Sequence, residues 1–373
     1  MPADALATLT AIARSAGLPD PIVVDGPAGG YRHRARLAIR GRSASPKIGI
    51  FQEGSHRIVD IPRCPVHHAL VNEVAAAVRD AVRRSGVSLY GDGSRRGLLR
   101  YLQVVVERAS GSAQVVLVAN DTTPASLAST ATLLTEALGS RLHSLWWNGN
   151  TEPGNAILGT AWHRWSGPEA VVEAIGGARV FYPPAAFGQA NLPLADRLVD
   201  TVHGWVGDDA RVLELHAGVG AIGLGLVRRS RQVAFNEISQ EGRAGLALGI
   251  AALPAADRER TRVLAGPAAD HVGAIDDADV VVCDPPRRGL EPALLAHLAR
   301  HPPARLVLVS CDLDAFVAES RALTGAGATR LRALTAFVLF PFTAHVETLA
   351  LFERAGEEDG GEAARGRRSP PAV

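Results

Sequence analysis

The stretch Leu306-Val-Leu-Val-Ser-Cys-Asp312 decides the fold of this chain. Its four apolar residues run directly into Ser310 and Cys311. An apolar run this short, bounded by polar residues, is typical of a strand buried in a parallel sheet. In open α/β sheets, ligands bind at the carboxyl ends of such strands. The stretch therefore predicts Cys311 at the functional edge of a sheet, where a cysteine acts either as a nucleophile or as a small buried hydrophobe.

Strands and helices alternate on both sides of this stretch, from Gly167 onward. We expect strands at 211–215, 232–236, 261–264, 279–283 and 305–310, β-rich segments at 331–340 and 346–353, and helices from the glycine-rich turn to Arg228 and over 239–251. This alternation predicts a doubly wound, Rossmann-like α/β domain over residues 167–355. Residues 22–166 mix hairpins and helices and predict a smaller α+β domain, preceded by an N-terminal helix within 1–21. Residues 356–373 are rich in Gly, Glu, Arg and Pro and are expected to be disordered.

Bulk composition indicates a soluble globular protein, with 47% hydrophobic and 21% charged residues. No apolar run approaches the roughly 20 residues of a membrane helix, and the first residues lack the order of a signal peptide. The three cysteines make no disulfide framework. These features predict a cytoplasmic protein without a membrane partner.

Positive charge is concentrated near the N-terminus. Residues 22–100 hold fourteen arginines and lysines against six acidic residues, a net charge of +8 in that segment. Arg34, Arg36 and Arg40 share one face of an extended segment. The bias favours a domain that faces a polyanion such as RNA, although a solvated basic face explains the stripe equally well. The tryptophans of the same region are more typical of core packing.

A glycine-rich turn follows the strand at 211–215. Gly218 and Gly220 allow backbone N–H groups to approach a ligand, and Glu237, at the end of the next strand, is placed to accept hydrogen bonds from ribose hydroxyls. Both NAD and S-adenosylmethionine carry such a ribose. The stiff Asp284-Pro-Pro-Arg287 loop, which can present Asp284 to a flat base, favours a nucleobase methyltransferase. Cys283 lies within the preceding strand and is expected to serve packing.

Five motifs occur in an order that resembles the RNA (uracil-5-)-methyltransferases. They are Phe187-Gly-Gln-Ala-Asn191, the Glu214–Gly220 turn, Asp284-Pro-Pro-Arg-Arg-Gly289, Ser310-Cys-Asp312 and Phe340-Pro-Phe-Thr-Ala-His-Val-Glu347. The resemblance extends from about residue 30 to residue 354. It implies a class I methyltransferase domain and an RNA substrate, ribosomal or transfer.

The resemblance also implies roles for individual residues. Gln189, His216, Glu237 and Asp284 are expected to contact S-adenosylmethionine, with Cys311 as the nucleophile and Glu347 as the proton-abstracting base. His216, Ala221 and Leu313 depart from the family's usual aromatic, polar and proline residues and imply altered cofactor contacts. The usual N-terminal barrel is not expected. Some members of the family bind an iron–sulfur cluster through four cysteines. Cys64 matches one of these cysteines and the other three have no counterpart in this chain, so neither an iron–sulfur cluster nor another metal site is expected.

Uracil C5 is too weak a nucleophile to attack a sulfonium methyl group directly. Addition of a cysteine thiolate to C6 makes C5 nucleophilic, and a carboxylate must later remove the C5 proton. A buried thiol can reach the base only if the nucleotide leaves its stack. Two other classes stay open at this stage: an NAD-dependent oxidoreductase, and an RNA-binding relative with weak or no catalysis.

Overall fold

The computed structural model describes residues 1–325 and 327–356 of the 373-residue chain. Apart from Gly356, the tail for which disorder is predicted lies outside the described residues. The chain forms two compact units. Unit 1 comprises residues 1–26, 196–243 and 250–373, and unit 2 comprises residues 27–195 and 244–249. The predicted boundary between residues 166 and 167 stays a prediction; by their contacts, residues 167–195 group with unit 2.

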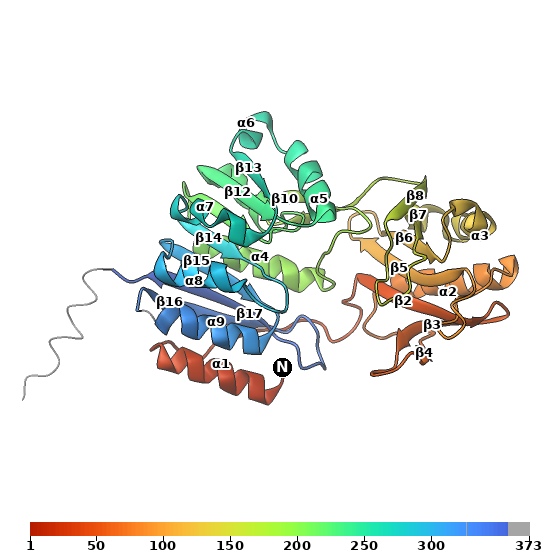
Figure 1. Cartoon of the computed structure of the whole chain (residues 1–373), viewed down its shortest axis with the longest axis horizontal. Coiled ribbons are helices and arrows are strands. Elements are labelled where there is room, and N and C mark those ends of the chain that lie inside the picture. The colour runs from red at the N-terminus through yellow and green to blue at the C-terminus, as the bar shows by residue number, and fades with distance from the viewer. Residues whose placement is uncertain (326, 357–373) are drawn as a thin grey trace, which may run out of the picture. The chain divides into compact units, whose positions relative to one another are not determined.

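Unit 1 is built on an eight-stranded sheet (Figure 1). Its strands are β1 (Ile22–Val24), β11 (Arg211–Leu215), β12 (Gln232–Glu237), β13 (Thr261–Ala265), β14 (Val280–Cys283), β15 (Arg305–Ser310), β16 (Thr329–Phe337) and β17 (Glu347–Arg354). Its helices are α1 (Ala3–Ser15), α4 (Leu192–Val206), α5 (Gln240–Ala251), α6 (Ala255–Arg258), α7 (Gly273–Asp276), α8 (Pro292–Arg300) and α9 (Leu313–Gly325), with 3₁₀ turns η3 (Gly223–Arg229) and η4 (Ala268–His271). Helices α4 and α5 also contribute residues to unit 2.

The strand order of this sheet is β1-β16-β17-β15-β14-β11-β12-β13. Every neighbouring pair is parallel except the two that include β17, which runs antiparallel to both β15 and β16. The first strand of the α/β pattern, β11, lies between β12 and β14, so the chain's direction of progress through the sheet reverses there. Crevices at such reversal points are where open α/β sheets bind ligands. The predicted doubly wound α/β fold is confirmed.

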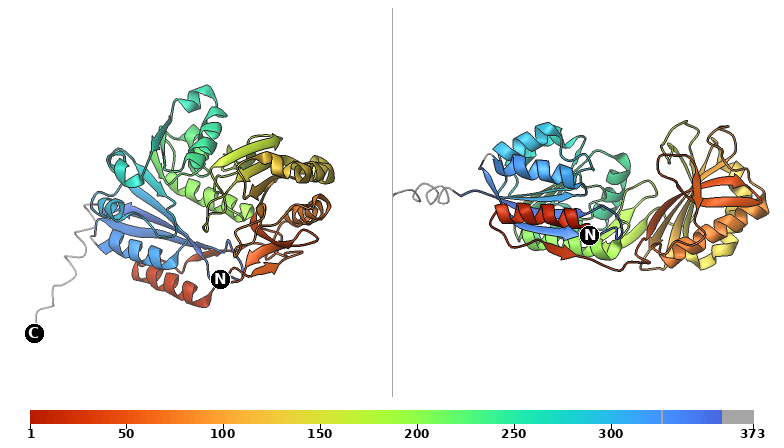
Figure 2. Two further views of the ribbon diagram at one scale, coloured as in Figure 1. Left: turned by 45° about the vertical axis from the view of Figure 1, so that its right-hand side comes forward. Right: turned by 90° about the horizontal axis from the view of Figure 1, so that it is seen from below.

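Helices α1, α8 and α9 pack on one face of this sheet. Leu9 of α1, Leu298 of α8 and Phe316 of α9 are fully buried in one core with Leu308 and Phe352 from the strands. Helix α1 lies along β16 (Figures 1 and 2). The N-terminal helix predicted within residues 1–21 therefore forms part of the core of unit 1, since its spacing of apolar residues presents one face to the sheet.

Unit 2 contains a seven-stranded sheet in the order β4-β3-β2-β5-β6-β7-β8. The strands are β2 (Arg34–Arg42), β3 (Ser45–Phe51), β4 (Ile58–Asp60), β5 (Leu99–Glu107), β6 (Ser112–Ala119), β7 (Leu142–Gly149) and β8 (Ala161–Ser166). A separate hairpin consists of β9 (Val171–Ile175) and β10 (Ala178–Tyr182). Helices α2 (Ala69–Ser85) and α3 (Ala128–Leu138) and the 3₁₀ turns η1 (Pro124–Leu127) and η2 (Gly139–Arg141) complete the unit.

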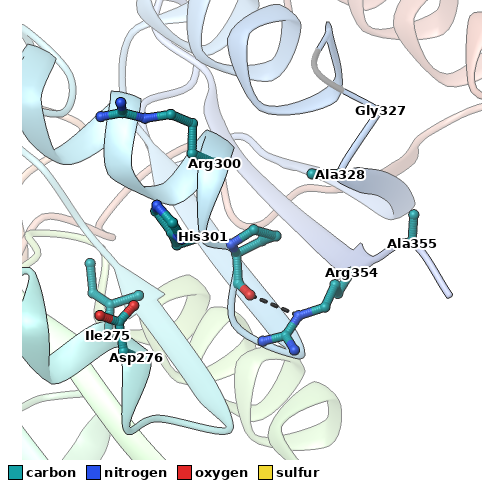
Figure 3. A pocket seen from close by; sticks show the side chains of 9 residues that line it. Ile275, Asp276, Arg300, His301, Gly327, Ala328, Arg354 and Ala355 are labelled. Carbon is teal, nitrogen blue, oxygen red and sulfur yellow. Dashed lines mark hydrogen bonds between the residues drawn. The ribbon is translucent and has the colours of Figure 1, made fainter. Parts of the chain in front are cut away.

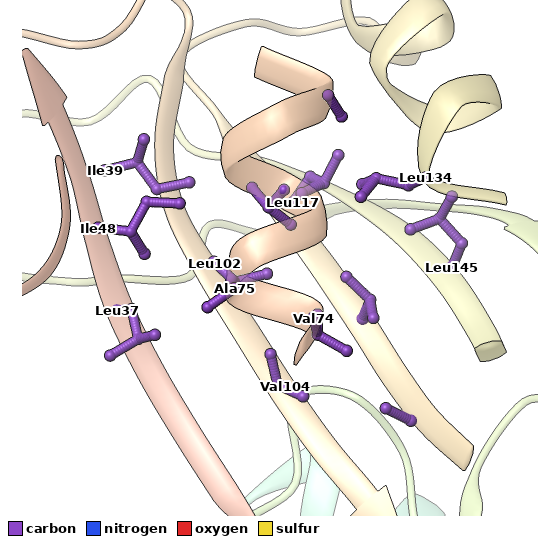
Figure 4. Packing of buried hydrophobic residues seen from close by; sticks show 14 of the residues in the cluster. Leu37, Ile39, Ile48, Val74, Ala75, Leu102, Val104, Leu117, Leu134 and Leu145 are labelled. Atoms are coloured by element: carbon purple, nitrogen blue, oxygen red, sulfur yellow. The ribbon is translucent and has the colours of Figure 1, made fainter. Parts of the chain in front are cut away.

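The core of unit 2 lies between this sheet and its two helices (Figure 4). Alternate residues of the strands, such as Leu37 of β2, Leu102 of β5 and Leu117 of β6, face Val74 of α2 and Leu134 of α3. The period of two along the strands and the helical spacing in α2 both place apolar side chains on this side. The residues between them, including the arginines of β2, therefore point to the other face of the sheet.

One predicted helix of the α/β domain differs in the structure. The segment after the glycine-rich turn is the 3₁₀ helix η3 rather than an α-helix. Two of its first three residues, Gly223 and Gly225, have low helix propensity. In addition, the N–H of Gly223 donates to the side chain of Glu214 at 2.9 Å. A side chain of the preceding strand thus holds the first residue of η3.

Candidate active site

The carboxyl edge of the parallel strands in unit 1 collects the predicted catalytic residues. His216 follows β11, Asp284 follows β14 and Cys311 follows β15. Glu347 is the first residue of β17, and because β17 is antiparallel to β15, it begins at the edge where β15 ends. Ser310 pairs with Thr348, so Cys311, the residue after β15, emerges beside Glu347. The topology therefore brings both predicted catalytic side chains to one edge of the sheet.

Cys311 lies in an electrostatic group with Asp284, Glu347 and Arg287. Burial, together with the negative charges of Glu347 and Asp284, raises the pKa of the Cys311 thiol to about 11, although the charge of Arg287 opposes this shift. Burial also raises the pKa of Glu347 to about 8, again with a contribution from Asp284. Burial also raises the pKa of the Asp284 carboxyl group, to about 7. Near neutral pH, therefore, the thiol is protonated, and Asp284 and Glu347 together retain more protons than two exposed carboxyl groups would.

The loop after β14 is fixed from beneath by Glu319 of α9. The N–H of Leu290 donates to a carboxylate oxygen of Glu319 at 2.6 Å. Gly289 has a φ of 79°, and a Cβ at this position would lie 2.4 Å from the same oxygen. Glycine is required here because any side chain would displace Glu319. Together with the two prolines at 285 and 286, this contact holds Asp284 and Arg287 in place.

The turn after β11 is held by two buried carboxyl groups. Glu214 accepts the N–H of Gly223 at 2.9 Å, and burial raises its pKa to about 8. Glu237, at the end of β12, accepts the N–H of Gly218 at 2.7 Å and that of Ser239 at 2.6 Å. Gly218 and Gly220 have φ values of 57° and 78°, which glycine adopts without strain. Glu237 thus closes the turn with one hydrogen bond to each of its two oxygens, and both oxygens keep a further lone pair.

His216 sits at the start of this turn in an unusual conformation. Its φ is 58°, in the left-handed region that non-glycine residues rarely adopt. Its Nε2 lies 3.3 Å from a carboxylate oxygen of Glu291, and burial lowers its pKa. Within the described residues, its buried Nδ1 has no hydrogen-bond partner. A buried nitrogen of this kind normally has a partner.

Gln189 belongs to unit 2, in the segment between β10 and α4. There it lines a small pocket with His33, Arg34 and Tyr182, among others. Its predicted contact with the cofactor stays a prediction, as do the contacts assigned to His216, Gly218, Gly220, Glu237 and Asp284 and the catalytic roles of Cys311 and Glu347.

Glu214, Glu291 and Glu319 are site residues that the sequence analysis did not identify. Glu214 gave the clearest signal, since an acidic residue inside an otherwise apolar strand needs a partner. Glu291 and Glu319 gave none, because their partners come from distant segments of the chain.

The arginine stripe of β2 is held by contacts within unit 2. Arg34 donates to the Ala186 carbonyl at 2.5 Å and Arg36 to Gln103 at 2.7 Å. Arg40 forms a two-bond ion pair with Asp92, at 2.7 and 2.8 Å, and its guanidinium group lies over three rings, those of Phe51, Tyr90 and Tyr101. Arg34 and Arg40 are therefore not part of a solvated basic face, whereas Arg36 stays exposed while it bonds Gln103. Other exposed cations of unit 2 include Arg42, at the end of β2, and Arg57, Arg63, Arg95 and Arg96 outside this strand.

A pocket of about 480 Å³ lies in unit 1 away from these residues (Figure 3). Its lining includes Arg300 and His301, which precede β15, and Arg354, at the end of β17. Arg354 donates to the carbonyl of Pro302 at 2.9 Å, as the figure shows. These positions mark the amino end of β15, whereas Cys311 follows its carboxyl end. The pocket is therefore separate from the candidate active site.

Two further properties bear on function. Across residues 1–325 and 327–356, no three His, Cys, Asp or Glu side chains come together in a way that could hold a metal ion. In the same part of the chain, none of the helices combines the length and apolar character that crossing a membrane requires.

Known proteins resemble this chain in sequence and in fold, although no family model matches it. A protein named as an uncharacterized RNA methyltransferase in Protochlamydia amoebophila is 34% identical over 341 residues, covering 90% of this chain and 89% of the relative. Another of that description, from Geobacter sulfurreducens, is 32% identical and covers 86% of this chain and 65% of the relative.

A solved structure shares the fold over nearly the whole chain. The Pyrococcus abyssi tRNA (uracil-54, C5)-methyltransferase, in complex with S-adenosyl-L-homocysteine, superposes with a TM-score of 0.76. It is 24% identical, and the match covers 94% of this chain and 83% of that one. The likeness extends through both units rather than the α/β sheet alone.

Proposed function

The chain belongs to the RNA methyltransferase family, and from this premise we propose that it transfers a methyl group from S-adenosylmethionine to C5 of a uridine in RNA, ribosomal or transfer. The observation that carries the proposal is the meeting of Cys311 and Glu347 at one edge of the sheet, next to Asp284. A thiol and a carboxylate in reach of one another are the two groups that methylation of uracil C5 demands.

The turn after β11 suits S-adenosylmethionine in two respects. Glu237 is buried at the end of β12, and in this proposal it accepts hydrogen bonds from the ribose hydroxyls. The Nδ1 of His216, which has no partner among the described residues, bonds a polar group of the same molecule. Gly218 and Gly220 leave the backbone open to close approach, and Asp284 lies on the neighbouring loop. When bound, S-adenosylmethionine supplies an electrophilic methyl group on its sulfonium sulfur.

The first step is the addition of the Cys311 sulfur to C6 of the uracil ring. The thiol must lose its proton, and Asp284, whose pKa burial raises to about 7, is the neighbouring base that can accept it. Formation of the S–C6 bond moves the C5–C6 π electrons to C5 and onward to O4, so C5 becomes a nucleophile. The positive charge of Arg287 favours the thiolate.

The second step is the removal of the C5 proton after methylation. Glu347 is 5% exposed and starts β17 beside Cys311. Its ionised form takes the proton, the C–H electrons restore the C5–C6 double bond, and the Cys311 sulfur leaves as a thiolate. A carboxyl group with a pKa near 8 is a stronger base than one with the ordinary value, which suits the removal of a carbon-bound proton.

A labelled-methyl assay tests the proposal. Total RNA from a strain that lacks the gene is incubated with the protein and methyl-labelled S-adenosylmethionine, and the nucleosides are then analysed. Wild type is expected to form 5-methyluridine, Cys311→Ala none, and the control Cys64→Ala, a cysteine of unit 2, the wild-type amount. If the wild type binds S-adenosylmethionine but forms no 5-methyluridine, the proposal is wrong.

Two binding measurements beside this assay separate the other two classes. An NAD-dependent oxidoreductase would bind the nicotinamide cofactor and be indifferent to Cys311→Ala. A non-catalytic relative would bind RNA without transferring a methyl group.

A further inference from the structure

Phe342 is the most exposed of the large apolar side chains that the structure describes, at 88%. It lies in the segment between β16 and β17, five residues before Glu347. Single exposed apolar side chains are common on protein surfaces. Burial of an aromatic ring is strongly favourable, however, so an exposed ring that the backbone holds at a conformational cost is a candidate contact for another molecule. None of the steps proposed above uses it.

The backbone holds Phe342 outward at a conformational cost. Its φ is 66°, in the left-handed region, whereas most non-glycine residues avoid that region. The N–H of Thr343 donates to the carbonyl of Phe340 at 3.3 Å, which closes a four-residue turn with Pro341 second and Phe342 third. Glycine is the usual third residue of a turn with proline second and a positive φ third. An aromatic residue in a glycine position indicates that the side chain serves a purpose other than the turn itself.

The turn is braced by its own side chains. The Thr343 hydroxyl donates to the Phe340 carbonyl at 2.8 Å and accepts the N–H of His345 at 3.3 Å. The rings of Phe340 and His345 meet edge to face, with centroids 6.4 Å apart. Since Val346 and Glu347 are buried directly after it, the turn is fixed to the sheet at its far end. The ring of Phe342 is therefore presented on a supported turn.

The turn rises from the edge of the sheet that carries the candidate active site. Strand β16 is antiparallel to β17, as β15 is, so β16 ends at the same edge as β15. Cys311, Asp284 and the turn that contains Phe342 therefore share that edge. The loop after Asp284 adds two exposed cations, Arg287 and Arg288.

We propose that the ring of Phe342 stacks on an unpaired nucleobase next to the target uridine and so positions the RNA for reaction; this inference rests on the proposed function. When a uridine leaves its stack to reach a buried thiol, its neighbours lose a stacking partner. A single exposed ring with cations on another loop of the same edge matches a base with its phosphates, because the ring stacks on the base and the arginines pair with the phosphates. A protein partner would instead require a continuous apolar patch.

Four variants at position 342 separate stacking from other roles. Phe342→Leu keeps an apolar side chain without a ring, Phe342→Gly removes the side chain and relieves the backbone, and Phe342→Tyr and Phe342→Trp keep a ring. Ile22→Ala is the control, since Ile22 is a 66% exposed residue of β1 in the same unit. For each protein, methyl transfer to total RNA from the gene-deleted strain gives kcat/KM, calorimetry gives the affinity for S-adenosylhomocysteine, and thermal melting gives Tm.

Loss of one base-stacking contact is expected to lower kcat/KM for RNA by about 5- to 150-fold. Phe342→Leu and Phe342→Gly should show this loss, whereas the Tyr, Trp and Ile22→Ala proteins should stay within about threefold of wild type. Affinity for S-adenosylhomocysteine should be unchanged throughout, and Tm of Phe342→Gly should equal or exceed that of wild type, because glycine suits a positive φ.

A fall of less than fivefold in either Phe342→Leu or Phe342→Gly overturns the inference, as does an equal fall in Phe342→Tyr. Such a result would leave the proposed function intact, because the wild type would still form 5-methyluridine. A wild type that forms none would instead remove the proposed function, and the inference with it.

Discussion

Replacing Glu214 by glutamine should remove a pH-dependent loss of stability from unit 1. Glu214 is a carboxyl group in the middle of the sheet, and burial raises its pKa from 4.5 to about 8. Glutamine has nearly the same shape, and its carbonyl oxygen can still accept the N–H of Gly223. The substitution therefore changes the titration of this position while it conserves the contact that holds the turn after β11.

The sign follows from the two pKa values. Between pH 4.5 and pH 8 the carboxyl group of Glu214 is ionised in the unfolded chain but protonated in the folded protein. The folded state then binds more protons, so its stability relative to the unfolded state falls as pH rises through this window and levels off above pH 8. One pKa unit corresponds to ~1.4 kcal/mol. From pH 5 to pH 8 the wild type should therefore lose roughly 4 kcal/mol relative to Glu214→Gln, an upper limit for a fully buried group.

Urea denaturation followed by circular dichroism gives the free energy of unfolding of both proteins at pH 5, 6, 7 and 8.5. Other buried carboxyl groups, such as Asp284 and Glu347, contribute to both proteins, so the difference between the two curves isolates position 214. The gap should widen in favour of Glu214→Gln up to pH 8 and then stay constant. Parallel curves would refute the reasoning, since they would mean that Glu214 is ionised in the folded protein.

The remaining predictions concern other contacts. Gly223→Ala places a Cβ 2.3 Å from a Glu214 oxygen and 2.6 Å from the Phe235 ring, so it should lower the free energy of unfolding by about 1–3 kcal/mol and weaken S-adenosylmethionine binding. Gly204→Ala, in open space on α4, should instead raise the free energy of unfolding by about 0.5–1 kcal/mol, as urea denaturation would measure. If Gly223→Ala and Gly204→Ala changed the free energy of unfolding equally, the close approach of residue 223 to Glu214 and Phe235 would be contradicted. Asp92→Asn should cost unit 2 about 2 kcal/mol in the same measurement by weakening the pair with Arg40, and an unchanged value would show that the pair contributes nothing. Finally, kcat/KM should rise from pH 6 to pH 9, because Cys311 and Glu347 must both lose protons. Asp284→Asn should lower kcat/KM, because it removes the proposed base for Cys311, and should move the remaining rise to lower pH by removing a negative charge beside both groups; a rise that stays in place would exclude Asp284 as the neighbour.

The sheet of unit 1 was predictable because its strands carry a local signal. The run before Cys311 is apolar and bounded by polar residues, which indicates a buried parallel strand whatever the partners are. The strands β1 and β8 were missed, since β1 has three residues and β8 has no buried residue, and both owe their conformation to their neighbours in the sheet. The hairpin of β9 and β10 was missed as well, although its residues alternate between buried and more exposed positions, which is a local signal for strands.

The arrangement of the site was predictable only in part. The order of motifs indicated which side chains reach one edge, but it could not show that Glu319 supports the loop of Asp284 or that Glu291 bonds His216. Those contacts join residues that lie 29 and 75 positions apart in sequence, so no periodic pattern within one segment indicates them. Likewise, alternation along β2 placed the three arginines on one face, but their partners, Ala186, Gln103 and Asp92, come from other parts of unit 2.

The most direct test of the covalent mechanism uses Glu347→Gln. This variant keeps Cys311 but lacks the base that removes the C5 proton, so the bond between the Cys311 sulfur and C6 should persist after methylation. The protein is incubated with S-adenosylmethionine and total RNA from the gene-deleted strain, digested with nuclease and trypsin, and analysed by mass spectrometry. The account predicts a methylated uridine nucleotide on the peptide that contains Cys311. An adduct on Cys64 or Cys283, or unchanged turnover of the variant without an adduct, would contradict it.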